Sequence, residues 1–265
     1  MKVLISSLLR KFWLLYFFDK LRYFYFFLKT ITIRKNFKKQ YSEIKLPPDY
    51  LIYESFRLNY EKYYFDGKDS AHWIISQLSR HAVVKNMKIL DWGCGPARMV
   101  RHLPEILNYT CDIYGTDYNE KSIDWCKNNI INIIFNCNKL EASLDYSDNF
   151  FDIVYGISIF THLSEKFHYL WFNELIRITK KDGILFFTTH GKAFLNKLTS
   201  VEQELFNTGQ IVEKGRTKEG HRTYSAFQPS DFFIKVIGKH EIIEFIEGKV
   251  KNGQPEQDIW VIRKI

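Results

Sequence analysis

Apolar and polar positions along the chain fall into two recurring patterns. Short apolar runs bounded by turn residues are typical of buried strands, and apolar residues three or four apart are typical of one helix face. The first pattern predicts strands at 112–117, 130–136, 150–158, 184–189, 240–247 and 258–264, the last two forming a hairpin through Asn252 and Gly253. The second predicts helices at 69–82, 119–128, 165–179 and 229–237. The alternation predicts an α/β fold with a mostly parallel sheet and an antiparallel last strand.

The stretch 88–98 joins the two patterns through a glycine turn. An apolar run ends at Leu90, Gly93 and Gly95 follow one residue apart, and Pro96 fixes the turn. Apolar residues near helical spacing come next: Met99, Val100, Leu103, Ile106 and Leu107. A strand, a glycine turn and a helix in this order let the backbone approach a nucleotide-like ligand closely.

Two residues distinguish this turn from a dinucleotide-binding fingerprint. Arg98 stands where the third glycine is required, and Asp91 precedes the first glycine. A carboxylate repels a pyrophosphate but suits a ligand that carries an amino group. The string Asp-x-Gly-Cys-Gly-x-Ala-Arg resembles motif I of the class I S-adenosylmethionine-dependent methyltransferases, in which glycine often stands at the position of Ala97.

The resemblance covers about residues 67–265, and 150–158 resembles motif IV of the same family. It implies a Rossmann-like fold with a seven-stranded, mostly parallel sheet, helices on both faces and an antiparallel last strand. It also implies S-adenosylmethionine as the cofactor and S-adenosylhomocysteine as the product. The implied cofactor-binding residues are Asp91, Trp92, Gly93, Cys94, Gly95, Arg98, Asp117, Tyr118, Asn138, Lys139, Leu140 and Ile157.

Asp117 ends the predicted second strand, 24 residues after Gly93. This is close to the roughly 20 residues expected for an acid that binds ribose hydroxyls, because a carboxylate accepts from two adjacent hydroxyls at once. The alternative is an aspartate in a solvated turn. Asn138 follows the third strand, where the family binds the adenine edge, and its amide both donates and accepts.

His162 is the first candidate for a catalytic base. It lies in Ser-x-Phe-Thr-His-Leu directly after the fourth strand, a pattern common in the family. Ligands of such folds bind at the carboxyl ends of the strands, and an imidazole titrates near neutral pH. The alternative is a histidine that caps the next helix or binds a backbone carbonyl. His190 and His221 are the reserve candidates.

Composition and cysteine spacing narrow the class of protein. Apolar residues make up 46% of the chain, which indicates a globular fold. Its four cysteines form no C-x-x-C pair and no zinc-like spacing, so no metal site is predicted. With no secretory signal in the sequence, we expect a reducing cytoplasmic location.

Positive charge is concentrated at the N-terminus. Residues 1–45 hold eleven basic and two acidic residues, a net charge of +9, so the remainder carries −1 of the total +8. We therefore expect no nucleic-acid partner for the catalytic domain. The basic, aromatic segment 1–40 predicts helices, either bound to an anionic membrane at its inner face or packed on the protein or a second subunit.

These patterns predict an N-terminal helical arm at 1–45 and a methyltransferase domain at 46–265. Within that domain, 46–68 forms a tyrosine-rich cap that either grips a polar ring-shaped acceptor or packs in the core. The polar stretch 192–228 is interpreted as an insertion near the acceptor site. The oligomeric state is left open.

The expected function is methyl transfer to a hydroxyl of a small polar acceptor. Similar small methyltransferases act in bacterial surface-polysaccharide pathways, which favours a sugar, a nucleotide-linked sugar or a glycan precursor. Two alternatives stay open. One is a nucleotide-sugar or NAD-linked oxidoreductase, against which Arg98 counts, and the other is an inactive binding partner with a methyltransferase fold.

Overall fold

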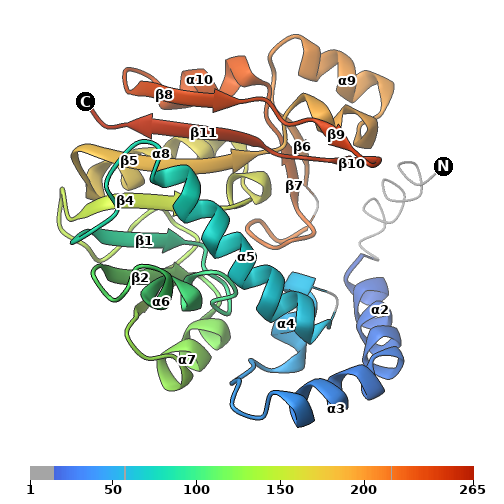
Figure 1. The fold of residues 1–265 in the computed structure, drawn as a ribbon. Helices are drawn as coiled ribbons and strands as arrows, with labels where there is room; N and C mark the ends of the chain where they lie inside the picture. The colour runs from blue at the N-terminus through green and yellow to red at the C-terminus, as the bar shows by residue number, and fades with distance from the viewer. Residues whose placement is uncertain (1–14, 57, 216) are drawn as a thin grey trace. The chain divides into compact units, whose positions relative to one another are not determined.

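A computed structural model describes residues 15–56, 58–215 and 217–265 (Figure 1). Seven strands of the described chain form one sheet in the order β3-β2-β1-β4-β5-β11-β8. The pairs β1–β2, β2–β3 and β4–β5 are parallel, whereas β11 runs antiparallel to both β5 and β8. The predicted Rossmann-like sheet with an antiparallel last strand is therefore confirmed, with helices around it.

Contacts divide the described chain into two compact units. We call Tyr16–Asn138 the N-terminal unit and Lys139–Ile265 the C-terminal unit. The predicted boundary at residue 45 stays a prediction, because this division follows a different criterion.

The N-terminal unit contains three strands and a series of helices. Its elements are α2 (Leu15–Lys29), α3 (Ile31–Gln40), α4 (Asp49–Phe56), α5 (Tyr60–Leu78), β1 (Lys88–Trp92), η1 (Val100–His102), α6 (Leu103–Ile106), β2 (Asp112–Asp117), α7 (Glu120–Asn129) and β3 (Ile134–Cys137). The helix predicted at 119–128 is α7; its N-cap is Asn119, whose side chain accepts from the Ser122 amide. The part of the predicted arm at residues 1–14 lies outside the described residues.

Three predicted elements of this unit have different bounds. Helix α5 begins nine residues before the predicted start, because the Asn59 side chain caps it by accepting from the Lys62 amide. The helix after the glycine turn is reduced to η1 and one turn of α6, ended by Asn108 and Tyr109 at positive φ. Strand β3 is shorter than 130–136, since Asn132 also has a positive φ.

Helices α2 and α3 pack on the tyrosine-rich segment, residues 46–68, through an aromatic core. Its buried members are Phe37, Ile52, Tyr53, Leu58, Tyr60 and Tyr63, with Tyr23, Phe26 and Phe27 packed against them. The Arg34 guanidinium donates to the Asp49 carboxylate, to which the Tyr60 hydroxyl also donates. Tyr53, Tyr60 and Tyr63 of the predicted cap therefore pack in the core. One face of the N-terminal arm packs against them.

The C-terminal unit contains the other strands of the sheet. Its elements are β4 (Phe151–Gly156), η2 (Phe160–His162), α8 (Glu165–Ile178), β5 (Thr179–Thr189), η3 (Lys192–Lys197), α9 (Ser200–Asn207), β6 (Val212–Lys214), β7 (Ser225–Phe227), α10 (Ser230–Ile237), β8 (Glu241–Ile246), β9 (Val250–Lys251), β10 (Gln254–Pro255) and β11 (Asp258–Arg263). The predicted glycine turn before the fifth strand is instead an irregularity within β5, where the register shifts and Asp182 has a positive φ. The β8–β11 pair is confirmed, and Asn252 and Gly253 turn at positive φ between β9 and β10.

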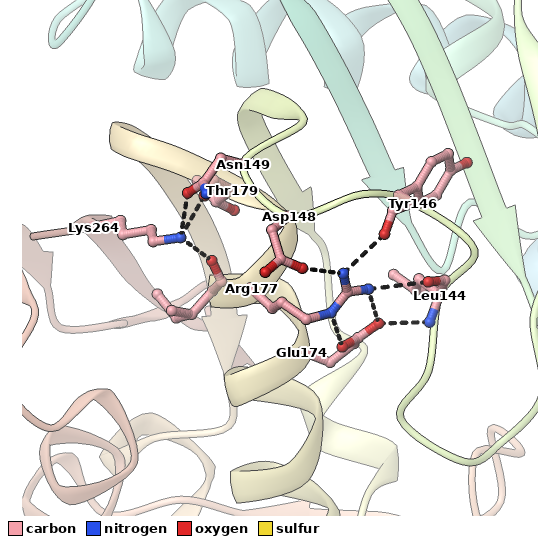
Figure 2. Close-up of polar contacts among 9 residues, drawn as sticks. Leu144, Tyr146, Asp148, Asn149, Glu174, Arg177, Thr179 and Lys264 are labelled. Carbon is pink, nitrogen blue, oxygen red and sulfur yellow. Dashed lines mark hydrogen bonds and ion pairs between the residues drawn. The ribbon is translucent and has the colours of Figure 1, made fainter.

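Arg177, in the last turn of α8, fixes the loop before β4 (Figure 2). Its guanidinium pairs with Glu174 on the same helix and with Asp148, and it donates to the carbonyls of Leu144 and Tyr146. Glu174 also accepts from the Leu144 amide, so both charges of this pair bond the loop. The planar guanidinium supplies enough donors for all of these acceptors.

Candidate functional site

The glycine turn after β1 adopts left-handed backbone conformations at three positions. Gly93 has φ 79°, Gly95 has φ 52° and Ala97 has φ 61°. The amides of Gly93 and Cys94 donate to the Thr116 carbonyl on β2, which anchors the turn to the neighbouring strand. The φ of Ala97 gives a physical reason for the glycine that the family often carries there, because a Cβ is disfavoured in this region.

Asp117, at the end of β2, bonds the turn directly. Its Oδ2 accepts from the Gly95 amide at 2.9 Å and its Oδ1 from the Asn119 amide at 2.8 Å. Burial raises the pKa of Asp117 to about 6, although these two amides favour the ionised form. The carboxylate of Glu54, on α4, adds to the increase in this pKa. Sequence reasoning missed Glu54, because only the fold brings α4 to the end of β2.

Helix α5 approaches the turn from its other side. The Tyr63 hydroxyl donates to the Pro96 carbonyl, and the backbone of Gly67 lies against Arg98, whose carbonyl oxygen would be 2.4 Å from a Cβ at Gly67. The Arg98 guanidinium donates to the Ser70 hydroxyl at 3.5 Å, and burial lowers its pKa. Arg98, predicted to bind the cofactor, thus has a contact with α5 that the sequence did not indicate.

The remaining predicted cofactor residues of the N-terminal unit are held by burial or by hydrogen bonds to β2. Trp92 and Cys94 are buried, so both side chains pack in the core, while the backbone of Trp92 ends β1 and that of Cys94 lies in the turn. Burial and the nearby Asp117 raise the pKa of Tyr118 to about 12. The Asn138 side-chain oxygen accepts from the Thr116 hydroxyl at 2.7 Å, and its backbone amide donates to the Asp117 carbonyl.

The C-terminal unit holds Lys139, Leu140 and Ile157 together with the candidate histidines. The Leu140 carbonyl accepts from the Trp171 indole at 3.0 Å. Ile157 follows β4 and is half-buried, and Lys139 is exposed. The structure therefore places the twelve predicted cofactor residues in two groups, nine in the N-terminal unit and three in the C-terminal unit.

His162 and His190 bind the same segment in the same way. The His162 Nδ1 lies 2.8 Å from the Tyr224 carbonyl oxygen, and the His190 Nδ1 lies 3.1 Å from the Ala226 carbonyl oxygen. A carbonyl only accepts, so each Nδ1 carries the proton and each Nε2 carries the lone pair in the neutral ring. Burial lowers the pKa of His162 below its usual range and that of His190 to about 3. Both rings are therefore neutral near pH 7.

His221 differs from these two in its tautomer. Its Nδ1 accepts from the Thr223 amide at 3.3 Å, so the neutral ring carries its proton on Nε2. The lone pair that could take a proton is then on Nδ1, which the Thr223 amide and the Thr223 hydroxyl, at 2.9 Å, already contact. His221 is thus a poorer candidate for a base than His162 or His190.

Polar residues that sequence reasoning missed bond the chain segments that carry His162 and His190. Buried Gln228 bonds the His190 backbone at both its amide and its carbonyl, and its side-chain nitrogen lies 3.0 Å from the Nε2 of buried His168. Gln257 donates to the Ser158 hydroxyl and accepts from the Thr188 hydroxyl. The insertion also bonds this region, since the Gly220 amide donates to the His162 carbonyl. These partners are far apart in sequence, so no local pattern indicated them.

Comparisons with known proteins decide the family. A family model described as a methyltransferase domain matches residues 84–245. The chain belongs to this methyltransferase family. The predicted class I S-adenosylmethionine-dependent methyltransferase, with S-adenosylmethionine as its cofactor, is thereby confirmed.

Solved structures share the fold of this methyltransferase at low sequence identity. An S-adenosylmethionine-dependent methyltransferase from Methanosarcina mazei is 15% identical with a TM-score of 0.53, over 71% of this chain and 97% of that one. Magnesium protoporphyrin IX methyltransferase from Synechocystis PCC 6803, solved with bound S-adenosylmethionine, is 13% identical with a TM-score of 0.51, over 75% and 79%. The PH0226 protein from Pyrococcus horikoshii OT3 is 18% identical with a TM-score of 0.53, over 78% and 96%.

The residues of the N-terminal unit fit this cofactor. A Cβ at Gly95 would meet no protein atom within 4 Å, so the turn offers an open side to a ligand. Asp117 supplies carboxylate oxygens with lone pairs beyond the two amide bonds, and Asp91 is a buried carboxylate at the end of β1. When bound, the cofactor supplies an electrophilic sulfonium methyl group. The chain's own task is to bind, orient and exclude water.

The open side of Gly95 gives a testable prediction. We expect Gly95→Ala to weaken S-adenosylhomocysteine binding at least about tenfold, because the methyl group enters ligand space, while the positive φ costs roughly 1–2 kcal/mol of stability. Gly253→Ala is the matched control, since Gly253 also has a positive φ (71°) and an open Cβ position. Calorimetry on both variants checks this. Equal affinities in the two variants would show that the turn does not contact the ligand.

Proposed function

We propose that this methyltransferase is an O-methyltransferase that acts in the cytoplasm on a small polar acceptor, namely a sugar, a nucleotide-linked sugar or a surface-glycan precursor. The observation that most supports an oxygen atom as the methyl acceptor is the tautomer of His162. Its Nδ1–H is held by the Tyr224 carbonyl, and its lowered pKa keeps Nε2 unprotonated near pH 7. A hydroxyl acceptor loses a proton when it is methylated, and a neutral imidazole can take that proton.

Three further features support this proposal. His190 offers a second neutral imidazole with the same orientation of its tautomer. The insertion carries polar groups in this region: the Tyr224 hydroxyl donates to Glu213, and Glu219 accepts from the Ser164 amide, two residues after His162. Such hydroxyl and carboxylate groups suit a hydroxyl-rich acceptor. The net charge of −1 after residue 45 does not favour a nucleic-acid acceptor.

The test is a transfer assay with S-adenosylmethionine that carries a labelled methyl group. We expect label in nucleotide-linked sugars or glycan precursors, on an oxygen identified by mass spectrometry. Label on an amine acceptor instead would make the protein an N-methyltransferase. Cofactor binding without transfer to any acceptor panel would favour the inactive binding partner, and hydride transfer with a nicotinamide cofactor would favour the oxidoreductase.

A further inference from the structure

Six large apolar side chains stand exposed on one face of α2. They are Phe17, Phe18, Leu21, Phe24, Tyr25 and Leu28, which we call the outer stripe, and each is between 45% and 59% exposed. At about 100° per residue these positions fall within an arc of about 120°. The outer stripe is thus one continuous helical face, and contiguous exposed apolar patches of this kind mark interaction sites.

The opposite face of the same helix already packs in the protein. Tyr23, Phe26 and Phe27 contact the aromatic core, and the Tyr53 hydroxyl donates to buried Asp19. Helix α2 is therefore anchored without the outer stripe. The apolar side chains of the outer stripe are therefore not needed to hold α2 on the protein, and their exposure points to another role.

Basic side chains border the outer stripe on both edges. Lys20 lies on one edge, and Arg22 and Lys29 lie on the other, all three exposed. Asp19, the acidic residue of α2, is 8% exposed and points into the core contact, so it does not offset them at the surface. Helix α3 continues the positive surface with three exposed lysines: Lys35, Lys38 and Lys39.

We propose that the outer stripe enters the headgroup region of an anionic lipid bilayer, with α2 lying in the plane of the membrane. An apolar face rich in aromatic residues and bordered by lysine and arginine is the pattern of an interfacial helix. No helix in the described part of the chain has the length and apolarity to cross a bilayer. A second copy fits less well, because a two-fold contact between outer stripes would bring their positive borders together.

The experiment uses the full-length protein in sedimentation with vesicles. One set is phosphatidylcholine mixed with phosphatidylglycerol, and the other is phosphatidylcholine alone. The stripe variant carries Leu21→Ser, Phe24→Ser and Leu28→Ser. The control variant carries Val83→Ser, Ile131→Ser and Val201→Ser, which remove three apolar side chains elsewhere that are even more exposed. S-adenosylhomocysteine binding confirms that each variant is folded.

We expect wild-type protein and the control variant to bind the anionic vesicles equally well. The stripe variant should bind at least about tenfold more weakly, because apolar insertion supplies much of the affinity. Replacing Lys20, Arg22 and Lys29 by glutamine should reduce the preference for anionic over neutral vesicles, with the lysines of α3 supplying what remains. Raising the salt from about 0.1 M to about 1 M should reduce that preference in the wild type.

Three results would overturn the proposal. In the first, the wild-type protein stays in the supernatant with anionic vesicles at low salt. In the second, the stripe variant binds as tightly as the wild type, so that another part of the chain holds the lipid. In the third, sedimentation velocity shows a dimer that the stripe variant loses, so that the outer stripe binds a second copy. Methyl transfer is measured separately and does not bear on these outcomes.

Discussion

Replacing Asp117 by alanine is expected to weaken S-adenosylhomocysteine binding at least about a hundredfold. The proposed ribose contact consists of two charge-assisted hydrogen bonds, worth roughly 1.5–3 kcal/mol each. Isothermal titration calorimetry measures the change. Unaltered affinity in Asp117→Ala would remove this carboxylate from the cofactor site.

The same substitution also loosens the glycine turn, so it needs a control. Asp117→Ala leaves the amides of Gly95 and Asn119 without their carboxylate acceptor. Tyr63→Phe removes a bond to the same turn, the one to the Pro96 carbonyl, without removing the proposed ribose contact. We expect both variants to melt at lower temperatures, and only Asp117→Ala to lose most of its affinity. A comparable loss of affinity in Tyr63→Phe would mean that turn stability, rather than the carboxylate, determines binding.

The raised pKa of Asp117 adds a pH dependence to this prediction. Because the folded-state pKa of about 6 lies above the usual aspartate value, Asp117 stabilises the apo protein at low pH, and this contribution is lost as the pH rises through about 6. Cofactor affinity should change with pH in the opposite direction, because ribose hydroxyls donate better to the ionised carboxylate. Affinity should therefore fall below about pH 6 in the wild type, and this fall should disappear in Asp117→Ala.

Local sequence patterns correctly predicted those parts of the fold that depend only on residues close together in the sequence. The β1 strand, its glycine turn and the Asn119 N-cap depend on residues within a few positions of one another. The helix predicted at 69–82 starts too late, because a glycine such as Gly67 is common at helix boundaries and α5 in fact begins at Tyr60. In the structure Gly67 lies within the helix, where the Arg98 backbone leaves no room for a side chain.

Side-chain partners in the candidate site could not be predicted in this way. His162 bonds the carbonyl of Tyr224, which is 62 residues away, and Gln257 is 99 residues from Ser158. A histidine that caps a helix or binds a carbonyl was the open alternative for His162. The structure shows the carbonyl contact, and that contact fixes the tautomer that a base requires, so the two interpretations are compatible.

His162→Asn is expected to reduce kcat about a hundredfold or more, with cofactor affinity nearly unchanged. Asparagine is the informative replacement, because its amide can still donate to the Tyr224 carbonyl while the basic Nε2 is lost. His190→Asn is the matched control, since it likewise preserves a bond to the Ala226 carbonyl. If His190→Asn lowers kcat instead, the roles of the two histidines are exchanged.

The pH profile separates a base from a structural histidine. Burial holds the pKa of His162 below its usual value, so the acidic limb of kcat in the wild type, at saturating cofactor, should lie at lower pH than an ordinary imidazole would give. In His162→Asn the acidic limb should vanish along with the rate, because no imidazole is left to protonate. A variant with reduced kcat that keeps the wild-type acidic limb would show that His162 positions the Tyr224 segment without accepting the proton. The methyl acceptor would then lose its proton to another group, and His190 would be the first to test.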